Sequence, residues 1–210
     1  MSKKVLVLGG TRFIGRTFCE SLLELGGIEL TLFNRGQSDP NLFPEANKIV
    51  CDRNDSVGCK SKLAMTTWDT IIDFNGNSDQ QIRNIVMNCE ARHYTYISSS
   101  AVELSTSSDR QFGVAKNKLW CENLLAQYVK NLLIVRLGNV CGNHDYTERF
   151  EERNGVWYWS GRQVAVRPMV RVDFLARSLV QLMHSQTKGI VRAGYHAKDA
   201  STNAKQGFFI

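Results

Sequence analysis

Residues 5–15 have the sequence VLVLGGTRFIG, and this stretch decides the fold of the chain. The apolar run Val5–Leu8 lacks a polar face, as a central parallel strand requires. A glycine-rich turn follows, and apolar residues then recur at spacings of three and four, which is typical of an amphipathic helix. A strand, a glycine turn and a helix in this order predict a dinucleotide-binding crossover, with Gly9 in the tight turn and Gly15 where the helix approaches the sheet. The alternative is a tight turn that binds no ligand.

The rest of the chain continues to alternate between strand-like and helix-like segments. This alternation predicts an α/β fold, a Rossmann-like doubly wound parallel sheet. Ser78 and Gln81 have the spacing of a capping box, so we expect a helix after Ser78 with an apolar face that extends to Cys89. Longer helices are predicted at residues 112–129 and 172–183. The other strands are expected at residues 28–33, 48–51, 70–74, 94–98, 132–137 and 190–193.

The composition is typical of a globular protein from a reducing compartment. Of the 210 residues, 43% are hydrophobic and only 3 are proline, which argues against disorder. The chain has no apolar run of about 18 residues and no secretory signal at its start, so we expect a cytoplasmic protein without a membrane segment. Six cysteines are spread singly along the chain, so we expect reduced thiols and no metal site. A formal net charge of +6 favours an acidic partner, either a cofactor phosphate or a nucleic acid.

Several short motifs in a fixed order resemble one known family. They are residues 9–15, Ser98-Ser99-Ser100, the FGVAK of residues 112–116, the RLGNVCG of residues 136–142 and the VDFLA of residues 172–176. From Val5 to about Met183 the chain resembles the NAD-dependent epimerase/dehydratase family, which consists of extended short-chain dehydrogenase/reductases. Arg12 stands where most members have the middle glycine of G-x-x-G-x-x-G. That variant is similar to the atypical branch that includes the chloroplast stem-loop binding proteins.

The resemblance implies one NAD(P)-binding Rossmann-type domain over residues 1–210. Within it, residues 143–170 would be a variable substrate-side segment and residues 171–210 a shortened C-terminal part. NAD-preferring members carry an acid after the second strand, whereas this chain has Arg35 there, and an arginine can pair with a 2′-phosphate. We therefore expect NADP in preference to NAD. The implied cofactor-binding residues are Gly9, Gly10, Thr11, Arg12, Phe13, Ile14, Gly15, Asn34, Arg35, Asp52, Arg53, Phe74, Asn75, Gly76, Lys116 and Asn139.

The family's chemistry implies a tyrosine and a lysine four residues apart on one helix face, with a serine from the end of the fifth strand. Ser99 and Lys116 match the serine and the lysine. Phe112 stands in place of the tyrosine and has no proton to exchange. We still expect Lys116 to contact the cofactor. Glu103, His144 and Asp145 are the residues that could replace the tyrosine as acid or base. The alternative for each is a solvated side chain without a catalytic role.

Two functions remain open at this point. The first is an epimerase/dehydratase-like enzyme that acts on a nucleotide sugar or another small molecule. The second is an NADP-sensing or RNA-binding protein on the same fold, because arginine and aromatic residues interleave over residues 149–171. The alternative interpretation, which we favour, is that these arginines are solvated and surround a few aromatic residues of the core. The helices near residues 78–91 and 112–129 resemble the pair that forms family dimers, so a homodimer is also open.

Overall fold

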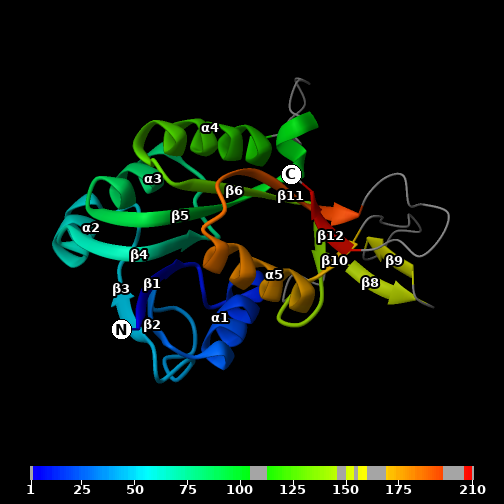
Figure 1. The fold of residues 1–210 in the computed structure, drawn as a ribbon, viewed down its shortest axis with the longest axis horizontal. Coiled ribbons are helices and arrows are strands. Elements are labelled where there is room, and N and C mark those ends of the chain that lie inside the picture. The colour runs from blue at the N-terminus through cyan, green and yellow to red at the C-terminus, as the bar shows by residue number, and fades with distance from the viewer. Residues whose placement is uncertain are drawn as a thin grey trace.

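The structure is a computed structural model in which a mostly parallel sheet lies between two layers of helices (Figure 1). The residues it describes are 2–104, 113–145, 150–153, 156–159, 169–195 and 206–209. Only the backbone is described for residues 104, 150–153, 156–159, 194–195 and 206–209.

The main sheet has the strand order β12-β11-β6-β5-β4-β1-β2-β3. Neighbouring strands from β3 to β11 run parallel, and β12 pairs antiparallel with β11. The order reverses between β1 and β4, which is where doubly wound sheets bind ligands. The predicted Rossmann-like fold class is therefore confirmed. The strands of this sheet are β1 (Lys3–Leu8), β2 (Ile28–Asn34), β3 (Asn47–Val50), β4 (Thr66–Asp73), β5 (Cys89–Ser99), β6 (Leu132–Leu137), β11 (Gly189–Tyr195) and β12 (Gln206–Phe209).

Helices cover both faces of the sheet, which explains why residues Val5–Leu8 of its central strand β1 are all apolar and buried. Val5 and Val7 pack in the cluster beneath α1 and α5, whereas Leu6 and Leu8 pack in the cluster beneath α2, α3 and α4 (Figure 1). Within the described parts of the chain, no helix has the length and apolar character needed to cross a membrane. The helices are α1 (Phe13–Leu25), α2 (Ser56–Leu63), α3 (Asp79–Val86), η1 (Ser100–Leu104, a 3₁₀ helix), α4 (Gly113–Tyr128) and α5 (Val172–Ser185).

The helix after Ser78 is shorter than the sequence predicts. Its start agrees with the prediction, because Ser78 Oγ accepts a hydrogen bond from the Gln81 N–H at 3.4 Å. The helix nevertheless ends at Val86, and Cys89 begins β5, where it lies opposite Thr66 of β4. The expectation that the helix extends to about residue 91 is wrong because strand pairing with β4 takes these residues into the sheet.

Several short strands in the last third of the chain were not predicted. Residues 143–170 include a hairpin of β8 (Phe150–Arg153) and β9 (Val156–Trp159), which lies beyond the main sheet in Figure 1. The strand β10 (Met169–Arg171) pairs parallel with β7 (Asn139–Cys141). Strands of three or four residues are too short to carry a recognisable period, so the sequence gives little signal for them.

Candidate functional site

The turn between β1 and α1 requires glycine at two positions. Gly9 has a φ of +84°, a conformation that side chains disfavour. A Cβ on Gly15 would lie 2.1 Å from the main-chain oxygen of Gly9, so a larger residue does not fit there. Arg12 instead has an extended φ of −138°, which any residue adopts. The close approach directs the free N–H groups at the start of α1 towards the end of the sheet, where an anion can bind.

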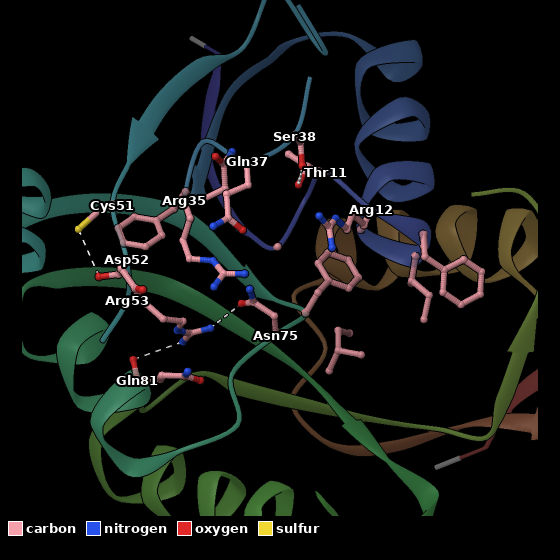
Figure 2. A pocket seen from close by; sticks show the side chains of 18 of the residues that line it. Thr11, Arg12, Arg35, Gln37, Ser38, Cys51, Asp52, Arg53, Asn75 and Gln81 are labelled. Atoms are coloured by element: carbon pink, nitrogen blue, oxygen red, sulfur yellow. Dashed lines mark hydrogen bonds between the residues drawn. The ribbon is translucent and has the colours of Figure 1, made fainter. Parts of the chain in front are cut away.

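A cavity of about 500 Å³ lies at the carboxyl ends of β1, β2, β3 and β4 (Figure 2). Gly10 and Gly76 are buried behind its wall: a Cβ on Gly10 would lie 2.8 Å from Cys19 Sγ, and one on Gly76 would lie 2.7 Å from Asp73 Oδ2. Most of the residues expected to bind the cofactor line this cavity: Gly9, Thr11, Arg12, Phe13, Ile14, Gly15, Asn34, Arg35, Asp52, Arg53, Phe74 and Asn75.

The cavity carries more positive than negative charge. Arg12 precedes α1 and Arg35 follows β2, and neither side chain has an ion-pair partner among the residues that the structure describes. Figure 2 shows Arg35 extending from its strand towards Asn75. Asp52 is the carboxylate of the cavity, and hydrogen bonds from Asn54, together with the charge of Arg35, lower its pKa. The arrangement therefore favours an anionic ligand with more than one negative charge.

A buried ion pair holds the floor of the cavity in place. Arg53 donates two hydrogen bonds to Asp73, of 2.9 and 2.8 Å, and a third to Asn75 Oδ1 at 2.6 Å. Asp73 also accepts a hydrogen bond from Tyr94 Oη at 3.0 Å. Burial opposes ionisation of Asp73, but the contacts with Arg53 outweigh it and lower the pKa of this carboxyl. Arg53 thus orients Asn75. It also lines the cavity, but its charge is already paired with Asp73.

A second cavity, of about 280 Å³, adjoins the first and shares apolar side chains with it. Ser99 and Asn139, both expected at the site, line it. Ser99 Oγ accepts a hydrogen bond from the Ala101 N–H at 3.2 Å, at the start of η1. The side chains common to both cavities are Phe13, Ile14, Phe74 and Ile97.

The lysine of the second cavity is Lys118, whereas Lys116 lies exposed on the same helix. Lys118 Nζ donates to the main-chain oxygen of Ile97 at 2.7 Å and lies 4.7 Å from the centre of the Tyr96 ring. Burial lowers the pKa of Lys118, although nearby Asp73 acts in the opposite direction. The helical period could have identified this lysine, since Lys118 is three residues from the buried Ala115 and Cys121.

A chain of hydrogen bonds that was not predicted from the sequence lies behind the second cavity. Ser98 Oγ donates to the buried carboxylate of Glu122 at 2.5 Å. Arg136 donates to the same carboxylate at 3.1 and 2.6 Å and to Glu103 at 3.2 Å. Other cavity residues that were not predicted are Phe33, Gln37, Ser38, Cys51, Asn54, Gln81, Ile97, Leu137, Gly138 and Val140.

The replacement acids and bases considered from the sequence line neither cavity. Partial burial raises the pKa of Glu103, but hydrogen bonds from Arg192 and Arg136 outweigh this and lower it, so Glu103 is a carboxylate at neutral pH. His144 lies 3.2 Å from the Glu20 carboxylate on α1, and the Asp145 N–H donates to Gly142. Phe112 lies outside the described residues.

The strand order, the glycine turn and the two adjoining cavities define a Rossmann-type fold with a candidate ligand site at the switch point of its sheet. Residues 5–87 match the NAD dependent epimerase/dehydratase family, and the predicted recognition of that family is confirmed. The chain is similar to the chloroplast stem-loop binding protein of 41 kDa b from Arabidopsis thaliana, with 33% identity over 118 residues. This match covers 50% of the chain and 31% of the relative, so the chain spans about a third of that protein's length.

Solved structures support the fold. One is a short-chain dehydrogenase/reductase from Veillonella parvula in complex with NADP, with 15% identity, a TM-score of 0.68 and coverage of 92% of this chain and 95% of that one. Another is the enzyme WbmF from Bordetella bronchiseptica in complex with NAD+ and UDP, with 14% identity, a TM-score of 0.65 and coverage of 91% and 71%. At these identities the likeness is one of fold.

Proposed function

We propose that the chain binds NADP across the two cavities and acts on a nucleotide sugar as an epimerase/dehydratase-like enzyme. The observation that carries the proposal is the pair Arg12 and Arg35, which line a cavity at the switch point of the sheet without ion-pair partners among the described residues. The nicotinamide cofactors of the Veillonella and Bordetella structures, and the UDP of the latter, support it. NAD is the alternative cofactor.

The residues of the first cavity fit the phosphates of such a cofactor. The close approach of Gly15 to the main chain of Gly9 holds the turn in a form that presents the start of α1 to a diphosphate, where Arg12 adds a positive charge. Arg35 fits a 2′-phosphate, because its guanidinium can donate two parallel hydrogen bonds. Asp52 would contact the adenine, and Asn75, held by Arg53, would contact the adjoining ribose. When bound, the cofactor supplies the capacity to accept and return a hydride.

The second cavity would hold the nicotinamide end and the substrate. The proposal assigns to Lys118 the cofactor contact that the sequence suggested for Lys116, because Lys118 lines the cavity. Among the described residues that line this cavity, Lys118 alone has a titratable side chain. Its lowered pKa suits proton transfer. Ser99 and Asn139 would position the substrate oxygen and the nicotinamide.

Calorimetric titration of NADP and NAD tests the cofactor assignment. We expect NADP to bind more tightly than NAD, and Arg35→Ala to weaken NADP at least about tenfold while NAD changes little. Arg92→Ala is the matched control, because Arg92 is an exposed arginine in β5 that lines neither cavity. Equal affinities for the two cofactors, or an unchanged NADP affinity in Arg35→Ala, would refute the preference.

RNA binding without turnover is the second candidate function, because the relative from Arabidopsis thaliana is named for stem-loop binding and the chain has a net charge of +6. Such binding to a stem-loop RNA should weaken steeply between low and moderate salt. Retention of RNA together with no sugar product from UDP-sugars would favour this candidate. Of the arginine and aromatic side chains that interleave over residues 149–171, Arg171 forms an ion pair with Asp173, and those of residues 149–168 lie outside the described side chains.

We also propose that the chain forms a homodimer through α3 and α4, which lie side by side in Figure 1. The exposed indole of Trp120 donates to Asp79 Oδ1 at 3.4 Å, and Met87 and Val114 leave further apolar surface exposed on these helices and their ends. Sedimentation should give a dimer that Trp120→Glu converts to a monomer, and a monomeric wild type would contradict the proposal.

A further inference from the structure

Two thiols lie against each other in the wall of the first cavity. All six cysteines are free and buried. Cys51, directly after β3, lines the cavity, and Cys59 belongs to α2 behind it. Their sulfur atoms are 4.0 Å apart. Both sulfurs also contact one main-chain oxygen, that of Asp52, at 3.4 Å from Cys51 and 3.6 Å from Cys59.

The surroundings of this pair permit the sulfurs to approach further. A disulfide needs a separation of about 2.05 Å, so the sulfurs must move together by about 2 Å. A Cβ on Gly58 would lie 3.0 Å from Cys51 Sγ, so the lack of a side chain at Gly58 lets this thiol lie directly against α2. β3 is the last strand of the sheet and has four residues, and such edges adjust more easily than central strands.

We propose that Cys51 and Cys59 form a redox-sensitive thiol pair, which a small disulfide compound converts to an intramolecular disulfide and which controls ligand binding in the first cavity. The second part of this inference rests on the proposed NADP site, whereas the first part does not. No other described pair of cysteines combines a thiol–thiol contact with access from a cavity.

The two thiols have different parts in the reaction. Burial and the adjacent Cys51 raise the pKa of Cys59 to about 12, so Cys59 is a poor first nucleophile. The Cys51 thiolate attacks one sulfur of the reagent, forms a mixed disulfide and releases one reagent thiolate. Cys59 then loses its proton to solvent and attacks the Cys51 sulfur, which releases the second thiolate. Two protein thiols are oxidised and one reagent disulfide is reduced to two thiols.

Disulfide formation would change the wall of the cavity. Cys51 is followed by Asp52, Arg53 and Asn54, which also line it, so a shift of Cys51 towards α2 moves these side chains. A cofactor in the cavity would cover Cys51 and oppose the shift. Because coupling between two sites is reciprocal, oxidation then weakens cofactor binding to the same degree that the cofactor disfavours oxidation.

The test treats the full chain with bis(2-hydroxyethyl) disulfide and follows its mass. We expect the loss of two hydrogen atoms, reversible by dithiothreitol. Trypsin cuts after Lys48, Arg53 and Lys60, so the disulfide should join the peptide of residues 49–53 to that of residues 54–60. Cys59→Ser should keep a reagent adduct on Cys51, and the control Cys141→Ser should still form the cross-link. A wild type without this cross-linked peptide would overturn the proposal.

The effect on the site is measured by calorimetry on the oxidised wild-type chain. We expect NADP affinity to fall at least about tenfold and to return on reduction, with NADP slowing the cross-link when it is present first. Full cross-linking with unchanged NADP affinity would overturn the control of ligand binding. Absence of NADP binding to the reduced chain, with the cross-link present, would instead contradict the proposed function and leave the disulfide supported.

Discussion

Lys118 Nζ donates a hydrogen bond to the main-chain oxygen of Ile97, and these two residues form adjoining parts of the second cavity. The contact fixes the ammonium at the end of β5, next to Ser98 and Ser99. α4 thereby contributes a residue to a cavity whose other lining residues come from strand ends and from the start of α1.

The first prediction compares the two lysines of α4. Lys118→Met should weaken NADP at least about tenfold, because a hydrogen bond from a charged group contributes about 1.5–3 kcal/mol. It should also remove any turnover of a UDP-sugar. Lys116→Met, which changes an exposed residue, should leave both within about twofold. Equal losses in the two variants would remove Lys118 from the site.

The second prediction concerns the glycine turn. Gly15→Ala should destabilise the chain by about 1–3 kcal/mol in urea unfolding, since its Cβ would lie 2.1 Å from the main-chain oxygen of Gly9. NADP binding should be lost as α1 moves away. Gly113→Ala is the control: it starts α4, and a Cβ there meets nothing within 4 Å, so its stability should not fall. A stable Gly15→Ala that still binds NADP would disprove the close-packing argument.

The third prediction concerns the buried ion pair. Arg53→Met should cost about 3–5 kcal/mol of unfolding free energy, because it leaves the carboxylate of Asp73 buried without its partner. Arg92→Met breaks the exposed pair with Asp69, and it should cost at most about 1 kcal/mol. Chemical denaturation of the two variants measures the difference. Similar costs would mean that the buried pair contributes no more than the exposed one.

The fourth prediction is a dependence of stability on pH. Asp73 has a pKa that the contacts with Arg53 lower from its ordinary value of 3.8. Its contribution is therefore complete above that value and is lost as the pH falls from 3.8 through the lower folded-state pKa. Asp73→Asn should show a shallower loss of stability than wild type over this acidic range, in urea titrations at successive pH values. Parallel curves for the two proteins would contradict the assignment.

The start of the fold could be predicted from the sequence because its constraints are local. The apolar run Val5–Leu8, the glycine turn and the period of α1 depend on neighbouring residues, and Gly9 and Gly15 occupy the predicted places. Arg35 could be placed at the cavity for the same reason, since it directly follows a recognisable strand.

Other features depend on pairing between distant segments. Cys89 was assigned to a helix because its spacing fits one, but β4 holds it in a strand. The spacing from Phe112 indicated Lys116, although the burial pattern of α4 places Lys118 at the cavity. Cys51 and Cys59 gave no signal as a pair, because eight residues separate them and only the packing of α2 brings their sulfurs together.

The apolar side chains shared by the two cavities lie between two parts of the site that differ in charge. The chamber beside Arg12 and Arg35 is cationic, whereas the chamber beyond Phe13 and Phe74 carries one lysine among mainly small and apolar side chains. A ligand that spans both cavities would consequently be held mainly by its phosphorylated part in the first cavity. The part of the ligand in the second cavity would dissociate readily unless it were covalently joined to the phosphorylated part. The anionic part would therefore supply most of the affinity, and the reactive part could vary between ligands.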